Sequence, residues 1–329
     1  MKTLLLIDAN SIIHRSFHAL PPFTDPAGEP TGAIYGLASI LLKLWREDRP
    51  DYAAALFDRP EPTFRDKKYA AYKAQRPATA DALVIQLKEA KNLFQTFGVK
   101  TFEMAGFEAD DLIATFAECF KEQGTRNKEQ GKELKIIILT GDRDTLQLVE
   151  DEKIYVRTFN KGISDTTTYD EAAVFEKYSL KPKQLIDYKA LVGDSSDNIK
   201  GVPGIGPKRA LELIEKFGTI ENLYAKLPGE PANVQSRLAP FKKEAELSKE
   251  LVLLEKHVPI EIPPLEGLAT PEAIPLETID YFQKKGFATL LKRMEKNEEN
   301  REGRMENGTG ATKKKSNPEK PKNIQERMF

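Results

Sequence analysis

Four short apolar segments, each followed within four residues by an acidic side chain, restrict this chain to few folds. They cover residues 3–7, 51–57, 99–104 and 135–139, and helical patterns lie between them. Strands that alternate with helices predict parallel βαβ units in one sheet. In such sheets ligands bind beyond the carboxyl ends of the strands, where the loops begin. We therefore expect an α/β fold with a mostly parallel central sheet flanked by helices, whose acidic loops lie at one edge.

The spacing of apolar residues predicts where the helices lie in the rest of the chain. In the first half, helices are expected at 12–20, 32–46 and 82–97, and residues 125–133 read as a polar loop. After about residue 168 the pattern is helical, with expected helices at 170–178, 182–192, 208–217, 241–254 and 278–294. From residue 296 onward, scarce apolar residues and mixed charges are typical of disorder. We expect an α/β catalytic domain over 1–180, a helical region over 181–295 and a charged tail or linker over 296–329.

Acidic side chains follow every apolar segment. A single acid would be explained as a helix cap, because the first turn of a helix favours negative charge. Three carboxylates in one turn, as in the stretch from Glu108 to Asp111, repel one another unless a cation lies between them. Like charges that converge on one crevice also cost free energy unless they are compensated. The pattern therefore predicts a cation site built from Asp8, Asp58, Glu108, Asp110, Asp111, Asp142 and Asp144.

The composition excludes several classes of protein. Cys119 is the only cysteine, so disulfides and cysteine-rich zinc sites are excluded and a reducing compartment is expected. His14 and His18 have the i, i+4 spacing of a zinc pair, but no third nitrogen or sulfur ligand is evident, which favours packing or phosphate contact. No apolar run reaches the ~18–20 residues of a membrane span. The net charge of −1 leaves nucleic acid open as a partner, because charge can be segregated on a surface.

A glycine-rich hairpin joins two of the expected helices. Its notable residues are Gly193, Asp194, Asp197, Gly204, Gly206, Lys208 and Arg209. Two helices joined in this way resemble the helix-hairpin-helix motif that binds the DNA backbone. The glycines let main-chain N–H groups approach a phosphate, and the basic pair adds positive charge at a helix N-terminus. The alternative is a Gly/Pro loop that only turns a corner.

A basic segment over residues 63–77 precedes the helix at 82–97. It reads as a short helix with too few large aliphatic side chains for the core. One face carries side chains at spacings of three and four, namely Arg65, Lys68, Tyr69, Tyr72, Lys73 and Arg76. Cations attract phosphates, and tyrosines offer planar surfaces to unstacked bases. A solvated charged helix is the alternative, and the position of the segment beside an acidic cluster favours a nucleic-acid contact.

The order of these motifs resembles a known family. The segments that carry the resemblance are Ile7-Asp8-Ala9-Asn10, Phe57-Asp58, Thr63-Phe64-Arg65, Tyr72-Lys73-x-x-Arg76-Pro77, Glu108-Ala109-Asp110-Asp111, Thr140-Gly141-Asp142-Arg143-Asp144 and Gly193-Asp194-Ser195-Ser196-Asp197-Asn198. Over about residues 3–294 they look like the 5′–3′ exonuclease and flap endonuclease family, in particular the N-terminal nuclease domain of bacterial DNA polymerase I. The resemblance implies a PIN-like 5′-nuclease fold with a helical arch at about 63–80 and a C-terminal helix-hairpin-helix subdomain.

The resemblance also implies roles for individual residues. The metal ligands would be Asp8, Asp58, Glu108, Asp110, Asp111, Asp142, Asp144, Asp194 and Asp197. Lys73 and Arg76 would be catalytic cations at the scissile phosphate, and Tyr72 would stack on a nucleotide. Arg15 matches a phosphate contact of the family. The duplex backbone, in this family often with K⁺, would be held by Gly204, Gly206, Lys208 and Arg209.

The expected chemistry is metal-assisted hydrolysis of a phosphodiester. Oxygen ligands suit hard cations, so Mg²⁺, with Mn²⁺ as a substitute, is expected rather than zinc. The reaction would use two ions ~4 Å apart and leave a 5′-phosphate and a 3′-hydroxyl. The first ion would be held by Asp8, Asp58, Glu108 and Asp110. The second would be held or oriented by Asp111, Asp142, Asp144, Asp194 and Asp197.

The resemblance implies DNA with a 5′-flap, nick or gap as the partner, including RNA primers on DNA. We expect a cytoplasmic monomer without a membrane partner. It would remove primers and flaps in replication and repair, with a DNA polymerase in cis or in trans. Two features depart from the family. Arg59 stands where relatives often have a small residue, and the chain stops before any polymerase region, as a stand-alone nuclease or a fragment would.

Two other functions fit parts of the pattern. A phosphatase on a doubly wound sheet would use Asp8 as its nucleophile, but the hairpin and the basic segment would then have no role. A structure-specific DNA clamp would use the acids only to order the fold around a metal ion. Release of inorganic phosphate without chain cleavage would indicate the phosphatase, and chelator-insensitive binding without cleavage would indicate the clamp.

Overall fold

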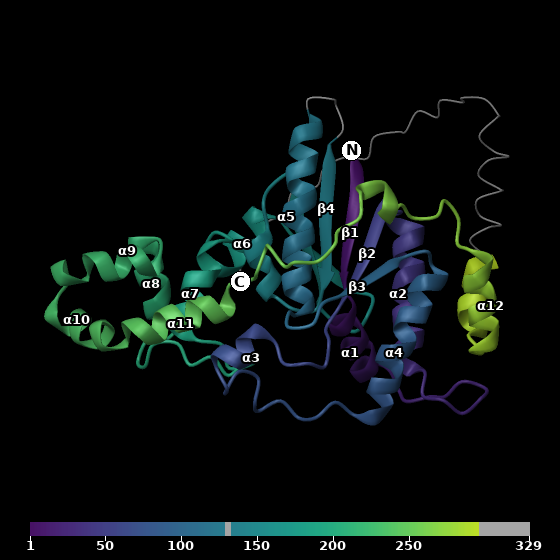
Figure 1. Cartoon of the computed structure of the whole chain (residues 1–329), viewed down its shortest axis with the longest axis horizontal. Coiled ribbons are helices and arrows are strands. Elements are labelled where there is room, and N and C mark those ends of the chain that lie inside the picture. Colours follow the sequence, from purple (N-terminus) through teal and green to yellow (C-terminus); the bar gives the residue numbers. More distant parts are fainter. Residues whose placement is uncertain (129–132, 296–329) are drawn as a thin grey trace, which may run out of the picture. The chain divides into compact units, whose positions relative to one another are not determined.

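The computed structural model describes residues 1–128 and 133–295 and contains one six-stranded sheet in the order β3-β2-β1-β4-β5-β6 (Figure 1). Its strands are β1 (Lys2–Asp8), β2 (Tyr52–Phe57), β3 (Lys100–Glu103), β4 (Leu134–Thr140), β5 (Ile154–Phe159) and β6 (Thr166–Tyr169). Neighbouring strands are parallel except β5 and β6, which are antiparallel. The predicted α/β fold with a mostly parallel sheet is confirmed.

The central strands are apolar because both of their faces are covered. Residues 4–7 of β1 are all buried, and every residue of β2 is buried. Such continuous apolar runs are typical of parallel strands with helices on both sides. In the register of the sheet, Ile7 lies between Ala55 of β2 and Leu139 of β4. These three strands therefore end side by side, and the acids that follow them share one edge.

Helices cover both faces of the sheet (Figure 1). On one face α1 (Ala9–Ala19), α2 (Gly32–Glu47) and α4 (Asp81–Thr96) pack against one another. On the other face α5 (Ala109–Lys128) contacts β1, β2 and β4. It buries Leu112, Phe116 and Phe120 in one cluster with Leu4 and Leu6 of β1. The first turn of α5 lies at the edge where the strands end, so the acids at its start reach the same edge.

The helical region continues the same hydrophobic core. Its helices are α6 (Glu171–Tyr178), α7 (Gln184–Val192), α8 (Pro207–Phe217), α9 (Ile220–Lys226), α10 (Ala232–Leu238) and α11 (Lys242–Val252). Leu191 of α7 and Ile214 of α8 belong to the cluster that contains the side chains of α5. The chain then returns to the sheet, where the Thr270 N–H donates to the Asp51 carbonyl at 3.0 Å, and α12 (Leu276–Lys284) packs against α4. Residues 1–287 form one compact unit, and the residues from 288 on belong to a second.

Four expectations about elements are corrected. The apolar pattern does not predict β5 and β6, because Arg157 and the threonines of β6 interrupt it at positions that are not fully buried. The polar loop expected at 125–133 is helical as far as Lys128, and residues 129–132 lie outside the described part. The helix expected over 278–294 is interrupted: α12 ends at Lys284, Gly286 takes a left-handed φ of +69°, and residues 288–295 are helical again. The basic segment is helical only in α3 (Phe64–Lys68), after which it continues in turns.

The expected tail over 296–329 lies outside the described residues. Within the described ones, no helix is both long and apolar enough to cross a membrane.

Candidate active site and nucleic-acid interface

One hydroxyl group joins the acids at the ends of β1 and β4. Asp8 caps α1, because its Oδ1 accepts the Ser11 N–H at 3.0 Å. Its Oδ2 accepts the Thr140 hydroxyl at 2.6 Å, and the oxygen of that hydroxyl accepts the Asp142 N–H at 2.9 Å. The Asp142 carboxylate in turn accepts the Asp144 N–H at 2.9 Å. The two strand ends thus present their carboxylates in a shared network.

Asp58 links the end of β2 to the start of α5. Its Oδ1 accepts the Ala109 N–H at 2.7 Å, and its own N–H donates to Asn10 Oδ1 at 3.2 Å. The next residue of α5 is Asp110, whose Oδ1 is buried and has no hydrogen-bond partner. Buried polar atoms are nearly always hydrogen-bonded in folded proteins. This oxygen is therefore a candidate ligand atom for a cation.

Asp8, Asp58, Asp110 and Asp142 form a group that we name the unpaired acids, since none of them has an ion pair with Lys or Arg in the described part of the chain. Burial, together with the charges of Asp58 and Asp142, raises the pKa of Asp8 to about 7. Burial and the charges of Asp142, Asp8 and Asp58 raise the pKa of Asp110 well above its usual range. A cation among these carboxylates would favour their ionised forms and relieve the repulsion.

The acids are not arranged as a finished metal site. Over residues 1–128 and 133–295, no three His, Cys, Asp or Glu side chains are close enough together to hold an ion as they stand. Carboxylates with no positive charge between them repel one another, and this repulsion is strong where water is excluded. Small side-chain movements toward a cation would therefore be needed to complete a site.

The other five predicted ligands have Lys or Arg partners, and we name them the paired acids: Glu108, Asp111, Asp144, Asp194 and Asp197. Glu108 accepts the Lys73 ammonium at 2.6 Å, and Asp197 accepts the Arg76 guanidinium at 2.6 Å. The Tyr72 hydroxyl lies 3.0 Å from an oxygen of each of these two acids. Burial raises the pKa of Glu108, although the charge of Lys73 opposes the shift. The basic segment thus supplies the positive charge that balances these acids.

Lys189 of α7 joins two more of the paired acids. Its ammonium donates to Asp194 Oδ2 at 2.7 Å and also contacts Asp144 Oδ1. Burial by itself would raise the pKa of Asp194, but hydrogen bonds from Lys189 and Ser196 outweigh it, and the pKa is lowered. Burial and the charge of Asp142 raise the pKa of Asp144 to about 6 in spite of Lys189. The lysine therefore balances only part of this acidic charge.

Protein donors engage both oxygens of Asp111, and its predicted role at the second ion stays a prediction. Its side chain is fully buried, and its two oxygens accept the Arg65 guanidinium at 2.7 and 2.8 Å. The N–H groups of Glu108 and Glu255 donate to the same two oxygens at 3.1 and 2.9 Å. An ion at Asp111 would compete with these donors for the lone pairs of the carboxylate. Arg65, itself 1% exposed, is a core residue and not part of an exposed basic face.

Tyr72 also differs from its expected role. The residue is 4% exposed and packs with Ile199, Leu251 and Val252, so its ring has no open face for a base in this structure. The next residue, Lys73, has a left-handed φ of +50°. This conformation is uncommon outside glycine and persists where the surrounding structure holds it, often at functional sites.

Backbone hydrogen bonds tie the basic segment to the hairpin. The Lys73 N–H donates to the Asp197 carbonyl at 3.0 Å, and the Asn198 amide donates to the Ala71 carbonyl at 2.6 Å. Asn198 also has a left-handed φ, of +58°. These contacts hold the predicted catalytic cations beside an acid of the hairpin.

The predicted helix-hairpin-helix consists of α7, a glycine-rich loop and α8. A Cβ on Gly201, whose φ is +64°, would lie 2.3 Å from the Gly193 nitrogen, so only glycine fits this close crossing of the loop. Gly204 has a φ of +77° and faces open space, and Gly206 caps the start of α8. The first turn of α8 then carries the exposed cations Lys208 and Arg209. An exposed glycine loop followed by cations at the start of a helix is suited to binding a phosphate group.

Arg15, the remaining predicted phosphate contact, binds the turn between β5 and β6. Its guanidinium donates to the carbonyls of Gly162 at 2.6 Å and Asn160 at 3.0 Å. It also lies over the Phe159 ring. Arg15 therefore already has three protein partners, and its contact with a phosphate stays a prediction.

A largely apolar pocket of about 820 Å³ adjoins the unpaired acids. Its lining includes His14, Phe17, His18, Phe57, Asp58, Arg59, Arg76, Leu83 and Leu87. Arg59, which departs from the family pattern, is paired with Glu61 at 2.9 Å on the pocket wall. The pocket lies between α1, α4 and the segment that follows Arg76, and Asp58 is the unpaired acid in its lining.

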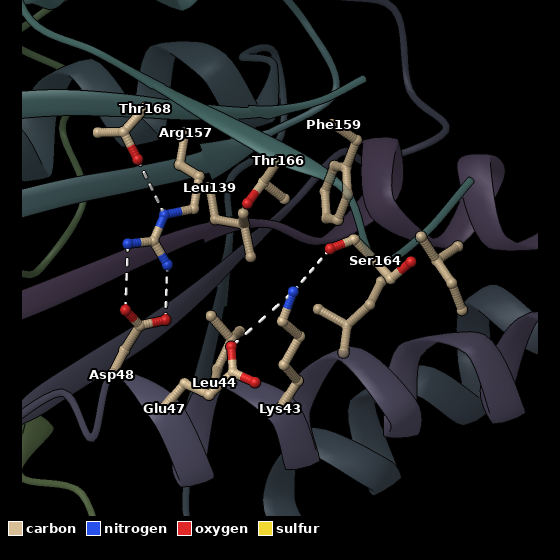
Figure 2. Close-up of a pocket in the computed structure, with 12 residues that line it drawn as sticks. Lys43, Leu44, Glu47, Asp48, Leu139, Arg157, Phe159, Ser164, Thr166 and Thr168 are labelled. Carbon is tan, nitrogen blue, oxygen red and sulfur yellow. Dashed lines mark hydrogen bonds and ion pairs between the residues drawn. The ribbon is translucent and has the colours of Figure 1, made fainter. Parts of the chain in front are cut away.

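A smaller pocket of about 220 Å³ between α2 and the β5–β6 pair has no such relation to the acids (Figure 2). Figure 2 shows that its charged groups bind one another: Arg157 donates to both oxygens of Asp48, at 2.6 and 3.1 Å. Lys43 donates to the Ser164 carbonyl at 2.6 Å. None of the predicted site residues lines this pocket.

Several contacts that shape the site were not foreseen from the sequence. The Thr140 hydroxyl, the Arg65 guanidinium and the Lys189 ammonium each touch one or two of the acids. The spacing of the basic residues predicts an exposed position for Arg65. Nothing in the neighbouring sequence indicates that its side chain is buried. Lys189 lies five residues before Asp194 at the end of a helix, a spacing that would have suggested a contact across the turn.

Solved nuclease structures share this fold. T5 5′-exonuclease with divalent zinc ions superposes with a TM-score of 0.61 at 23% identity, covering 91% of this chain and 99% of that chain. The catalytic core of Rad2 in complex with DNA substrate superposes with a TM-score of 0.53 at 16% identity, covering 86% and 88%. At such identities the likeness establishes the fold alone. The fold, with its carboxylates at the sheet edge and its hairpin, is that of the 5′-nuclease class.

The sequence comparisons are more specific. The model of the 5′-3′ exonuclease N-terminal resolvase-like domain matches residues 3–179, and that of the 5′-3′ exonuclease C-terminal SAM fold matches residues 180–273. The 5′-3′ exonuclease of Aquifex aeolicus is 37% identical over 80% of this chain and 85% of its own length. The chain belongs to the 5′–3′ exonuclease family.

DNA polymerase I of Caldicellulosiruptor bescii is 37% identical over 88% of this chain but only 33% of its own length. For DNA polymerase I of Bacillus subtilis the identity is 36%, over 89% of this chain and 32% of the polymerase. The chain thus spans about a third of the length of these polymerase relatives.

Proposed function

We propose that the chain is a structure-specific 5′–3′ exonuclease and 5′-flap endonuclease that hydrolyses DNA phosphodiesters with divalent metal ions. The observation that carries the proposal is the buried, unpartnered Oδ1 of Asp110; burial and three neighbouring aspartates raise the pKa of this carboxyl group. Membership of the 5′–3′ exonuclease family supports the reaction class. A structural relative, T5 5′-exonuclease, has divalent metal ions bound.

The unpaired acids suit a hard divalent ion, because all of their donor atoms are carboxylate oxygens. We propose that Asp8, Asp58, Asp110 and Asp142 hold the first Mg²⁺ or Mn²⁺. Glu108, expected in this set, is engaged by Lys73 and Arg65 and is better placed to bind them than an ion. A second ion would lie toward Asp144, Asp194 and Asp197. When bound, the two ions would activate the attacking water and stabilise charge on the phosphoryl oxygens.

Lys73 and Arg76 supply the positive charge that the chain itself brings to a substrate phosphate. Each now binds a paired acid, Lys73 at Glu108 and Arg76 at Asp197. A phosphate that enters the site offers both cations a new anionic partner. Their charges would then stabilise the negative charge that develops in the transition state. The hydrogen bond from the Lys73 N–H to the hairpin sets the position of this lysine before substrate arrives.

We propose that DNA binds across the hairpin and the basic segment. Lys208 and Arg209 would contact the duplex backbone beside Gly204 and Gly206, with K⁺ as an additional ligand of the loop. The end of the strand to be cleaved would pass beside residues 63–80 to reach the acids. The Rad2 core, which shares the fold, is known in complex with a DNA substrate.

We further propose a role in the removal of flaps and primers, RNA included, during replication and repair. The chain would act as a cytoplasmic monomer, with a DNA polymerase in cis or in trans. This proposal is supported by the polymerase I relatives, in which the matching segment is about a third of the protein.

Cleavage of a labelled 5′-flap duplex tests the proposed reaction. The chain should release products with a 5′-phosphate and a 3′-hydroxyl in Mg²⁺ and none in EDTA. Asp110→Asn should slow cleavage at least about 100-fold, since it removes the negative charge and one carboxylate oxygen from the ligand set. Asp280→Asn, an exposed acid of α12, is the matched control and should cleave like the wild type. Full Mg²⁺-dependent activity in Asp110→Asn would refute the assignment.

The same samples separate the two other functions. Release of inorganic phosphate without shortening of the strand would indicate a phosphatase that uses Asp8. Binding of the flap duplex in EDTA at unchanged affinity, with no cleavage in Mg²⁺, would indicate a DNA clamp.

A further inference from the structure

Lys189 lies between two acids that come from different parts of the fold. Asp144 begins the short helix η1 (Asp144–Leu148) after β4, whereas Asp194 belongs to the hairpin that follows α7. The Lys189 ammonium donates to Asp194 at 2.7 Å and contacts Asp144 at the same time. No other residue in the described part of the chain makes an ion pair with either acid. The contact between the α/β domain and the hairpin at this point therefore depends on one positive charge.

The local structure sets this position. Gly193 ends α7, and its N–H donates to the Lys189 carbonyl at 2.7 Å. Its φ of +83° reverses the chain, so that Asp194 returns beside the side chain of Lys189. The Ser196 N–H and hydroxyl hold the other oxygen of Asp194 at 2.8 and 2.5 Å. Asp194 is thus turned toward Lys189 by the loop itself.

We propose that Lys189 is a positioning residue that holds Asp144 and Asp194 in place of the second divalent ion and competes with that ion for them. The inference rests on the proposed function, because it presumes that these acids face a metal site. The Lys189 ammonium bridges two carboxylates from separate elements and neutralises part of their charge, as a bridging divalent ion would. The unpaired acids have no such cation, so the two halves of the cluster should differ in their affinity for metal.

The competition follows from electrostatics. An ion that binds between Asp144 and Asp194 must either displace the ammonium or lie beside it, and both cost free energy. The first ion meets no such charge at Asp110. The chain should therefore bind one ion tightly and a second one weakly, and the weak site should tighten when the charge of Lys189 is removed.

Titration with Mn²⁺ in the absence of DNA, with free Mn²⁺ measured by electron paramagnetic resonance, tests the proposal. The wild type should show one tight and one weak class of site. In Lys189→Met the weak class should tighten by about tenfold or more, and the tight class should be unchanged. Lys189→Arg keeps the positive charge and should keep the weak class weak. Thermal unfolding in EDTA should show a lower Tm for Lys189→Met, and Mn²⁺ should raise that Tm more than it raises the Tm of the wild type.

The chain offers a matched control. Lys249 bridges Asp187 at 2.7 Å and Glu221 at 2.8 Å, which is the same two-acid geometry at acids that no metal is proposed to bind. Lys249→Met should lower the Tm in EDTA in a similar way but should leave both classes of Mn²⁺ site unchanged. Lys189→Gln, which keeps a hydrogen-bond donor without the charge, replaces Lys189→Met if the latter does not fold.

The outcomes distinguish this inference from the proposed function. An unchanged or weaker second site in both neutral variants would overturn the role of Lys189 and leave the metal cluster intact. Equal tightening in Lys249→Met would also overturn it, because the effect would then be one of net charge. A wild-type chain that binds no Mn²⁺ would overturn the metal cluster and this inference together.

Discussion

The unpaired and the paired acids contain the same chemical groups within one cluster, yet their charges are balanced in different ways. Asp110 and Asp111 are neighbours in α5 and illustrate the difference. Asp111 receives four hydrogen bonds, two of them from Arg65, whereas Asp110 has a buried oxygen with no donor. Successive helical residues point in directions about 100° apart, so one faces the core cation and the other faces the remaining acids. The chain completes one half of the cluster itself and leaves the other half for a ligand.

This comparison predicts that two conservative substitutions change the free energy of unfolding in opposite directions. The larger change is expected for a paired acid. Asp111→Asn should lower the free energy of unfolding by about 3–5 kcal/mol, because it leaves the buried Arg65 guanidinium without its counter-charge. Urea denaturation in EDTA measures the loss. The control is Arg59→Met, which removes the exposed pair with Glu61 and should change stability little. A similar small change in Asp111→Asn would show that the buried pair is not a stability element.

On the unpaired side, Asp110→Asn should raise the free energy of unfolding in EDTA by about 1–3 kcal/mol. Burial and three neighbouring aspartates disfavour the ionised form of this carboxyl group, and asparagine carries no charge at any pH. The same variant loses Mg²⁺-dependent cleavage, so stability and activity change in opposite directions. Denaturation curves of the two variants in parallel test the contrast. A loss of stability in Asp110→Asn as large as that in Asp111→Asn would remove the distinction between the two groups.

The pH dependence of stability provides a third test. The pKa of Asp8 is raised to about 7 in the folded chain, against about 3.9 in an unfolded one. Its contribution to stability is therefore fully present below about pH 4 and is lost as the pH rises through 7. In EDTA the chain should be more stable at pH 5.5 than at pH 8 by about 1–3 kcal/mol.

Two variants and one ligand sharpen this test. Asp8→Asn should flatten the profile, whereas Asp165→Asn, which changes an exposed acid outside the cluster, should leave it intact. Saturating Mg²⁺ should also flatten the profile, because an ion favours the ionised acids. A wild-type profile in EDTA that does not fall between pH 5.5 and 8 would contradict the raised pKa.

The smallest expected effect concerns cations rather than acids. Lys208 has no ion-pair partner within residues 1–128 and 133–295, whereas Lys216 of the same helix is paired with Glu230 at 2.7 Å. Lys208→Ala should weaken binding to duplex DNA several-fold and reduce the slope of log affinity against log salt by about 1. Lys216→Ala should change neither. Equal effects of the two variants in a salt series would argue against a specific role for the hairpin.

The strands that the sequence predicted are the ones with continuous apolar runs. Residues 4–7 and 136–139 are buried between helices, and their composition reflects that burial directly. β5 and β6 escaped the prediction because Arg157 and the threonines of β6 break the apolar runs at positions that are not fully buried. The position of the acids was also predictable, since parallel strands end at one edge. The burial of Tyr72 was not, because the small cluster that receives it comes from α11 and the hairpin.

The order of apolar runs and acids determined, by sequence alone, that this chain folds into a parallel sheet with a cluster of carboxylates at one edge. Both features are local, because each depends on a strand and the few residues after it. Only the tertiary structure decided which carboxylates are already neutralised. Their partners Arg65, Lys73 and Lys189 lie 46, 35 and 45 residues away from Asp111, Glu108 and Asp144. Whether such charges meet depends on the packing of whole elements, and no local pattern records it.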